Sequence, residues 1–306
     1  MQEIKNITIL GAGAMGGYFA ATFFGSPGFR TSLVARGKRY DRLKSDGLVV
    51  NGKRAMIPVV HPDEASAPAD LIIVGLKHHH LATALPDLKN LVGDKTTIIS
   101  IMNGLDSEEI IGSLYGMDKI LYAISVGIDA LRQGNQITYT KPGKHYFGEA
   151  TNTHLSQRVR RVQDAFDRAG IIYETPADMM RMLWWKFMIN VGMNQASAVM
   201  RAPYGVFQTS VQAQDLMEAL MDEVITLAGL SGVNLFPQDI QDWYTVLNTL
   251  SPHGQTSMLQ DIEAGRKTEV EIFGGKVVAL GKEYGTPTPV NQTVLSIIQV
   301  LEQGAG

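Results

Sequence analysis

The sequence predicts an α/β protein with an N-terminal doubly wound parallel sheet followed by an all-α C-terminal region. Short apolar runs alternate with helix-forming segments up to about Tyr173, as in parallel sheets with crossover helices. Beyond that point the strand patterns stop and long helical segments follow. A chain of 306 residues has room for about two domains at roughly 150 residues each. We therefore expect a sheet domain of residues 1–175 and a helical domain of residues 176–306.

Composition narrows the classes of function. Hydrophobic residues make up 45% of the chain and charged residues 19%, so apolar surface suffices for two cores and intrinsic disorder is excluded. The net charge of −3 gives no basis for binding nucleic acid or an acidic membrane. The absence of cysteine excludes disulfides, thiolate nucleophiles and thiolate metal sites. We expect a cytoplasmic protein without a nucleic-acid or membrane partner, whose chemistry comes from other side chains or a bound cofactor.

The predicted strands of the first half are short apolar runs bounded by polar or turn residues. The runs at 71–77 and 96–104 are continuous, as in buried parallel strands, and residues 80–91 between them are expected to form a crossover helix. Residues 48–60 alternate in polarity and turn at Asn51-Gly52, which indicates a hairpin. Further strands are expected at 5–10, 31–36, 120–130, 136–140 and 145–150.

The second half is predicted to be helical from Pro176 onwards, because proline is favoured in the first turn of a helix. Helices are expected at 177–200, 211–232, 238–250, 255–264, 269–284 and 290–303. Methionines concentrated at 179–200 and 215–221 either fill irregular core gaps or line a subunit interface, so a homodimer stays open. The basic run at 158–161 is expected to form an exposed helix face.

A glycine-rich turn directly follows the first predicted strand, within an uncharged stretch (6–29) that superficially resembles a signal peptide. The six glycines of this stretch favour instead a buried strand that leads into a helix. The spacing G-x-G-x-x-G at 11–16 is typical of a Rossmann-type dinucleotide-binding domain, in which the glycines allow a tight turn, approach of a pyrophosphate and close helix packing. The residues expected to bind the cofactor phosphates are Gly11, Gly13, Ala14, Met15 and Gly16.

The second predicted strand ends in basic residues, which bears on the choice of cofactor. An NAD site usually has Asp or Glu here to bind the ribose 2′-hydroxyl, whereas this chain has Arg36 followed by Lys38 and Arg39. A guanidinium can bind a 2′-phosphate through two hydrogen bonds, and a carboxylate would repel it. The pattern therefore favours NADPH/NADP as cofactor, with an exposed basic loop as the alternative.

Polar residues also close two of the buried strands, since Lys77 ends the run at 71–77 and Asn103 ends the run at 96–104. Ligands of open α/β sheets bind outside the carboxyl ends of the strands, so both side chains are expected to face the cofactor or the substrate. The alternative is that they are ordinary loop residues. Three histidines (78–80) follow Lys77, but consecutive residues cannot share one face of a helix or strand, so no metal site is expected.

The predicted helix around 183–194 is almost entirely apolar, yet Lys186, Asn190 and Asn194 interrupt it at intervals of four residues. This spacing places the three on one face, to which Ser197 returns. Burying a lysine and two amides is unfavourable unless each has a partner, and a ligand-lined cleft would supply partners for all of them. A polar seam against another helix is the alternative. A lysine in such a cleft can hold a proton ready for a carbonyl oxygen.

An anionic neighbour is needed to orient Lys186, and the candidates include Asp261 and Glu269. Thr268 and Glu271 have the spacing of a capping box, so a helix is expected to begin near Glu269. The Glu269 carboxylate is then either functional or only a complement to the helix dipole.

Taken together, these residues resemble the ketopantoate reductase family (2-dehydropantoate 2-reductase) over essentially the whole chain. The first half carries ITILGAGAMGG at 7–17, VAR at 34–36, GLK at 75–77 and NGLDSEE at 103–109. In the second half, LWWKFMINVGMNQASAV (183–199) resembles the family's lysine helix, and TSMLQDIEAGRKTEVEIFGG (256–275) resembles its C-terminal signature. The last two motifs are far more specific than a glycine-rich turn, and all occur in the expected order.

The resemblance implies an NADPH-dependent reduction of a 2-oxo acid, 2-dehydropantoate, to the 2-hydroxy acid pantoate in pantothenate and coenzyme A biosynthesis. Lys186 matches the general acid that protonates the developing alkoxide, and Glu269 matches the carboxylate that binds the nascent hydroxyl and positions the lysine. The positions implied to contact the substrate are Asn103, Asn190, Asn194 and Ser257. The cofactor path is implied to include Gly11, Gly13, Gly16, Arg36, Lys77 and Asn103.

One position departs from the family pattern. Gly254, preceded by His253, stands where some members have an asparagine, so one expected hydrogen bond to the substrate is missing. The departure does not affect the assignment as an oxidoreductase, but it weakens the assignment of 2-dehydropantoate as the substrate. Reduction of another branched 2-oxo acid is therefore an alternative. A non-catalytic NADP-binding sensor is less favoured, because a sensor has no need of a proton donor.

Overall fold

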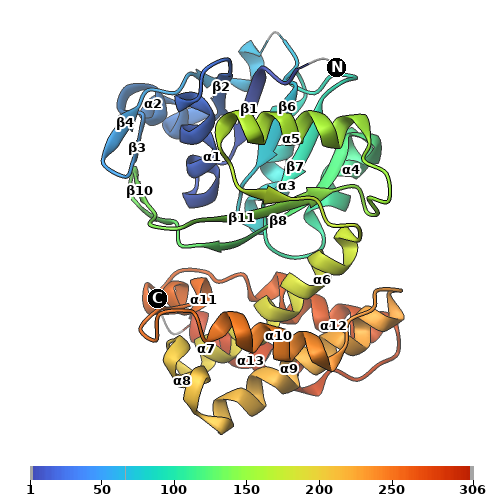
Figure 1. Ribbon diagram of the computed structural model, residues 1–306. Helices are drawn as coiled ribbons and strands as arrows, with labels where there is room; N and C mark the ends of the chain where they lie inside the picture. Colours follow the sequence, from blue (N-terminus) through green and yellow to red (C-terminus); the bar gives the residue numbers. More distant parts are fainter. Residues whose placement is uncertain (1–2, 66, 304–306) are drawn as a thin grey trace. The chain divides into compact units, whose positions relative to one another are not determined.

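The computed structural model describes residues 3–65 and 67–303 (Figure 1). The strands of its main sheet are β1 (Asn6–Leu10), β2 (Arg30–Val34), β5 (Val59–Val60), β6 (Leu71–Val74), β7 (Thr97–Ser100), β8 (Ile120–Ile128), β11 (Pro142–Gly148) and β12 (Tyr173–Glu174). Their order is β12-β11-β8-β7-β6-β1-β2-β5, and every neighbouring pair is parallel except β8 with β11. The strand order reverses at β1, which lies between β2 and β6. The predicted doubly wound parallel sheet is confirmed.

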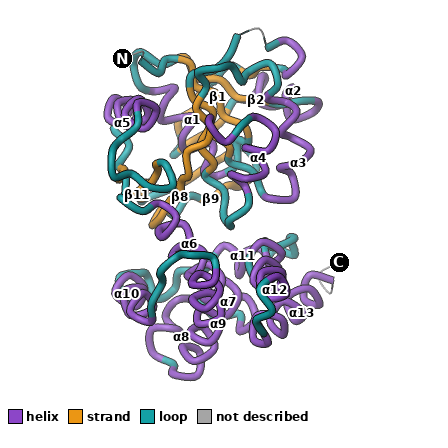
Figure 2. The backbone as a smooth tube through the Cα atoms, turned by 90° about the vertical axis from the view of Figure 1, so that its right-hand side faces the viewer, coloured by secondary structure: helices purple, strands orange, loops and turns teal. Residues whose placement is uncertain are grey.

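Helices cover both faces of this sheet because its apolar strand residues alternate between two cores. Ile7 and Ile9 of β1 belong to one buried cluster with residues of α1 (Ala14–Gly25) and α5 (Gln157–Ala169), including Phe19 and Phe166. Leu10 belongs to a second cluster with residues of α3 (Leu81–Ala84), η3 (Leu85–Leu88) and α4 (Ser107–Tyr115). Figure 2 shows α5 on one side of the strands and α3 and α4 on the other. Ligands of such sheets bind at the carboxyl edge, outside the ends of the strands.

A smaller sheet has the order β4-β3-β10-β9, from β3 (Leu48–Val50), β4 (Lys53–Ala55), β9 (Leu131–Gln133) and β10 (Gln136–Thr138). The hairpin expected at Asn51-Gly52 is confirmed: both residues have positive φ, 47° and 76°, as a tight hairpin turn requires. β10 pairs with β3 in parallel, so the distant hairpin β9–β10 joins the hairpin β3–β4. Ile137 of β10 packs against Gly17 of α1, where a Cβ would overlap its side chain.

The crossover helix expected at 80–91 is not one continuous helix. The segment consists of η2 (His78–His80), α3 and η3, and Pro86 lies inside η3. Because proline has no N–H to donate, it prevents α3 from continuing through this point. The remaining elements of the first half are α2 (Gly37–Asp46), η1 (Pro62–Glu64) and η4 (Met117–Lys119).

The chain divides into two compact units, Met1–Met182 and Leu183–Gly306, and the division falls within α6 (Met179–Ile189). The border between residues 175 and 176 that we proposed from the sequence lies just before this helix. The described part of the second unit is helical throughout, as expected. Its further elements are η5 (Asn190–Asn194), α7 (Gln195–Met200), α8 (Tyr204–Thr209), α9 (Val211–Leu230), α10 (Pro237–Leu247), α11 (Ser257–Glu263), η6 (Val270–Ile272), α12 (Gly274–Glu283) and α13 (Pro289–Gln303).

The long helix α9 forms the centre of the second unit. Met217 and Met221 of α9 are fully buried and lie against Gly192, where a Cβ would come within 2.5 Å of the Met221 side chain. These methionines therefore fill the core, one of the two roles expected of them. Gln195 donates to Asn291, which in turn donates to Glu223, so buried amides tie α7 and α13 to α9. No helix of the described residues is both long and apolar enough to cross a membrane.

Candidate functional site

The glycine-rich turn joins β1 to α1 at the point where the strand order reverses. Gly11 has a φ of +101°, and a Cβ there would overlap the carbonyl oxygen of Gly75. A Cβ on Gly16 would in turn overlap the carbonyl oxygen of Gly11. The backbone conformation and the packing of the chain itself therefore explain glycine at positions 11 and 16.

Gly13 is different, because nothing in the described part of the chain requires glycine there. Its φ of −74° suits any residue, and a Cβ would lie 3.7 Å from the nearest neighbouring atom, an ordinary contact. Gly13 is also the N-cap of α1, whose first turn contains no acidic residue. The space that the missing Cβ leaves lies at the N-terminus of a helix of 12 residues, which attracts anions. The loop thus fits the pyrophosphate of a dinucleotide.

Lys77 follows β6, the neighbour of β1, and Asn103 follows β7, the next strand of the sheet. β1, β6 and β7 end level with one another, since Leu10 pairs with Val74 and Val74 with Ser100. The structure therefore brings the segments after these strands to the edge where the glycine loop lies. In the described residues, no group of three or more His, Asp or Glu side chains is arranged to hold a metal.

A buried polar network supports the loop that carries Asn103. Ser100 and Ser107 share a hydrogen bond of 2.8 Å between their hydroxyls, and Ser107 donates to the Glu108 carboxylate at 2.7 Å. All three side chains are at most 1% exposed. Gly104, directly after Asn103, has a φ of +94°. The hydrogen bond between Ser100 and Ser107 thus ties the end of β7 to the start of α4, on either side of the loop that carries Asn103.

Arg36 lies at the N-cap of α2, after β2, but its guanidinium already has two acidic partners. It donates to Asp63 through two nitrogens, at 2.9 and 3.0 Å, and to Asp87 through Nε. The hydrogen bond from Arg36 lowers the pKa of Asp63, and the two acids raise the pKa of Arg36 further above its usual range. A 2′-phosphate would have to share or displace these carboxylates to bind Arg36.

Arg132 is a residue of this region that the sequence pattern did not identify. It lies on β9, yet its guanidinium donates to the carbonyl oxygen of Ala12 in the glycine loop and, through Nε, to that of Gly134 at 2.8 Å. No local motif marks it, because the contact spans 120 residues and depends on β10 pairing with β3.

In the second unit, the two asparagines of η5 and Ser257 of α11 form a hydrogen-bonded row. Asn194 donates to the side-chain oxygen of Asn190 at 3.2 Å, and Ser257 at the start of α11 donates to the side-chain oxygen of Asn194 at 3.2 Å. Lys186 precedes Asn190 by one helical turn. The structure therefore joins Ser257 directly to Asn194 and, through Asn194, to Asn190.

The row coincides with a π-helical segment, η5, between two α-helices. Such wide turns within helices are often found at functional sites. Ser197, which was expected on the same face, is fully buried and donates to the carbonyl oxygen of Ala202 at 2.7 Å. Thr256 also shares a hydrogen bond of 3.1 Å with it, so Ser197 fixes the ends of α7 and α11 instead of extending the row.

Glu269 is the N-cap of the short helix η6 and is partly buried. The capping box expected between Thr268 and Glu271 is wrong. Thr268 donates through its backbone N–H at 2.8 Å and through its hydroxyl at 2.5 Å to Glu302 of α13, while Glu271 accepts from Gln299. The other acid considered near Lys186, Asp261, binds Arg266 at 2.8 Å.

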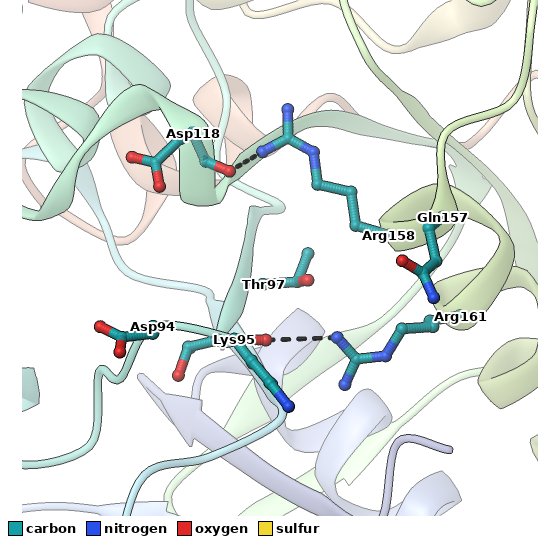
Figure 3. A pocket seen from close by; sticks show the side chains of 8 residues that line it. Asp94, Lys95, Thr97, Asp118, Gln157, Arg158 and Arg161 are labelled. Carbon is teal, nitrogen blue, oxygen red and sulfur yellow. Dashed lines mark hydrogen bonds between the residues drawn. The ribbon is translucent and has the colours of Figure 1, made fainter. Parts of the chain in front are cut away.

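A pocket of about 350 Å³ lies at the amino end of β7, so it is not part of the carboxyl-edge site (Figure 3). Its lining residues are Asp94, Lys95, Thr96, Thr97, Asp118, Gln157, Arg158 and Arg161. Figure 3 shows Arg158 turned to the carbonyl oxygen of Asp118 and Arg161 to that of Lys95. Arg158 also pairs with Glu149, so the basic run on α5 is partly engaged by the protein, contrary to the exposed face expected.

Two family descriptions match the chain in succession. Residues 7–152 match Ketopantoate reductase PanE/ApbA, and residues 178–302 match Ketopantoate reductase PanE/ApbA C terminal. The 2-dehydropantoate 2-reductase of Archaeoglobus fulgidus is 27% identical to this chain over 302 residues, which cover 99% of each protein.

Solved structures with similar folds include two oxidoreductases. D-mandelate dehydrogenase, in a ternary structure with NADH and anilino(oxo)acetate, has a TM-score of 0.89 at 23% identity, with 98% of this chain and 99% of that chain covered. Dimeric ketopantoate reductase from Staphylococcus aureus has a TM-score of 0.81 at 22% identity, with 98% and 100% covered. Because the two family matches together span most of the sequence, this chain is an oxidoreductase that belongs to the ketopantoate reductase family.

Proposed function

We propose that the protein catalyses the NADPH-dependent reduction of 2-dehydropantoate to pantoate, and that it acts in the cytoplasm in the biosynthesis of pantothenate and coenzyme A. The observation that carries the proposal is the row of Asn190, Asn194 and Ser257, one helical turn from Lys186. Amide and hydroxyl donors suit a 2-oxo acid, which presents a carboxylate and a ketone. A homodimer is also proposed, since Staphylococcus aureus ketopantoate reductase is described as dimeric.

In the proposed reaction, the reduced nicotinamide cofactor, when bound, supplies a hydride to C2 of the substrate. Lys186 donates a proton to the ketone oxygen, so that the C=O bond becomes CH–OH, and regains a proton from solvent. Glu269 binds the new hydroxyl and positions Lys186. Asn103, Asn190, Asn194 and Ser257 orient the substrate, whose fixed position accounts for much of the rate acceleration.

For the cofactor, we propose that the glycine loop and the N-terminus of α1 bind the pyrophosphate. Gly13 supports this assignment, because neither its φ nor its packing requires glycine. Arg36, Lys77 and Asn103 are proposed to complete the binding surface at the ends of their strands. The residues of the loop proposed to contact the phosphates are Gly11, Gly13, Ala14, Met15 and Gly16.

A second candidate is the reduction of another 2-oxo acid, and Gly254 favours it. A Cβ at this position would lie 2.9 Å from the ring of Tyr204 and 3.0 Å from the carbonyl oxygen of Ser251, so an asparagine would displace its neighbours. D-mandelate dehydrogenase, whose solved structure contains NADH and anilino(oxo)acetate, has a similar fold. The alternative substrate is therefore an aryl or branched 2-oxo acid, reduced with either NADPH or NADH.

The test is cofactor oxidation in the presence of a panel of 2-oxo acids, with NADPH and NADH compared at equal concentrations. We expect the highest kcat/KM for 2-dehydropantoate with NADPH. A higher kcat/KM for 2-oxoisovalerate or phenylglyoxylate would replace the first candidate by the second. Tight cofactor binding without turnover of any 2-oxo acid would indicate a sensor and overturn both.

Ser257→Ala is expected to raise KM for the 2-oxo acid by roughly tenfold, because one hydrogen bond to a charged group is lost. We expect a smaller change in kcat, since the bond is present in both the ground and the transition state. Steady-state kinetics check this, with Ser251→Ala, also at an exposed serine, as the matched control. A fall in kcat at constant KM would contradict a role in substrate binding.

A further inference from the structure

Three arginines of the first unit, Arg39, Arg42 and Arg132, form an arginine cluster beside the glycine loop. Arg39 and Arg42 lie on α2, which follows β2, and Arg132 lies on β9. The proposed function gives the cluster no role. Because the cluster lies next to the proposed dinucleotide site, the ligand group expected to bind it is a phosphate.

The pairing of strands directs Arg132 towards the glycine loop. Arg132 lies opposite Ile137 in the antiparallel pair β9–β10, and residues directly opposite one another have their side chains on the same face. Ile137 packs against Gly17 of α1, so this face of the small sheet lies against the start of the helix. The hydrogen bond from Arg132 to the Ala12 carbonyl oxygen follows from this placement.

The cluster brings like charges together in a partly buried place. Burial lowers the pKa of Arg132, and the charges of Arg39 and Arg42 lower it further. Burial also lowers the pKa of Arg39, again assisted by Arg42. Within residues 3–65 and 67–303, neither Arg39 nor Arg132 forms an ion pair with a carboxylate, and the first turn of α2 contains no acid. An anion bound here would relieve the repulsion.

Arg36 provides the contrast within the same region. Its guanidinium is neutralised by Asp63 and Asp87, whereas the positive charges of Arg39 and Arg132 are not offset in this way. NADPH differs from NADH by one additional phosphate, on the 2′-oxygen of the adenosine ribose. In Rossmann-type domains this ribose is bound near the end of the second strand, and β2 here leads directly into α2.

We propose that Arg39 and Arg132 bind the 2′-phosphate of NADPH and thereby set the preference for NADPH over NADH. The proposal rests on the proposed NADPH-dependent function, but it concerns cofactor binding alone and does not depend on which 2-oxo acid is reduced.

The test measures Kd for NADPH and for NADH, without substrate, by nucleotide fluorescence titration of the wild-type protein, Arg39→Ala, Arg132→Ala and Arg132→Lys. Each alanine variant is expected to weaken NADPH binding by roughly 10- to 100-fold, because a charge-assisted hydrogen bond is lost. NADH binding is expected to change little, and Arg132→Lys should recover part of the NADPH affinity. Arg54→Ala, on the opposite edge strand β4 of the small sheet, is the matched control.

The comparison of the two cofactors separates phosphate binding from a structural role. If Arg132 only holds the glycine loop through Ala12, its alanine variant loses affinity for NADPH and NADH by the same factor, and the proposal is overturned. Unchanged NADPH binding in both alanine variants also overturns it. Thermal unfolding of each variant shows whether it is folded, and Arg39→Ala, which breaks no hydrogen bond of the described chain, keeps the test decisive if Arg132→Ala does not fold. A wild-type protein that binds neither cofactor would refute the proposed function itself.

Discussion

Replacing Lys186 by alanine is expected to lower kcat by roughly 10²- to 10⁴-fold, the usual range for loss of a general acid. Without the ammonium group, the developing alkoxide has no proton donor and no positive charge beside it. The Kd for NADPH is expected to stay nearly unchanged, because every group that we propose to bind the cofactor phosphates belongs to the first unit, whereas Lys186 lies in the second. Steady-state kinetics and a separate cofactor titration measure the two effects independently.

The matched control is Lys282→Ala, which removes an exposed lysine from α12 of the same unit. Both variants should show similar thermal unfolding, so that a loss of activity in Lys186→Ala is chemical. A Lys186→Ala enzyme with kcat close to that of the wild type would remove Lys186 from the mechanism. The row of Asn190, Asn194 and Ser257 would then have to be explained as a polar contact between helices.

Those parts of the site that depend on local spacing were predictable from the sequence. Lys186, Asn190 and Asn194 repeat every four residues in an apolar helix, and the hydrogen bond between the two asparagines agrees with that spacing. The spacing did not show that the hydroxyl of Ser197 is fully buried and bonded to Ala202 and Thr256, because those partners come from outside the helix.

Contacts between distant segments were not predictable in the same way. Ser257 meets Asn194 across 63 residues, and only the resemblance to a known family grouped them. Arg132 meets Ala12 across 120 residues, and neither spacing nor resemblance marked it. The hydrogen bond depends on the pairing of β10 with β3, which the sequence does not specify because both strands have only three residues.

The predicted capping box failed because a residue distant in the sequence binds the groups that the box would use. Thr268 and Glu271 have the spacing of a capping box, but Glu302 accepts both the N–H and the hydroxyl of Thr268. The expected helix at 80–91 fails for a local reason instead, since Pro86 interrupts it. The long helices of the second unit needed no such information, because their apolar faces repeat over several turns.

The glycine loop allows stability and cofactor binding to be separated by two substitutions of the same kind. Gly16→Ala is expected to lower the free energy of unfolding by about 3 kcal/mol, because its methyl group overlaps the backbone at Gly11 and cannot be accommodated by a side-chain shift. Gly13→Ala is expected to unfold like the wild type, since its φ is ordinary and the nearest atom is 3.7 Å from the added Cβ. Thermal or urea unfolding of both variants measures this difference.

Gly13→Ala should nevertheless weaken the binding of NADPH and NADH alike, by roughly 10- to 100-fold, because the added methyl group keeps the pyrophosphate from the N–H groups at the start of α1. An equal loss for both cofactors distinguishes this site from Arg39 and Arg132, whose removal should affect NADPH alone. If Gly13→Ala binds both cofactors as tightly as the wild type, the pyrophosphate does not approach the backbone at Gly13. The glycine at that position would then need an explanation other than the cofactor, since neither its φ nor its packing supplies one.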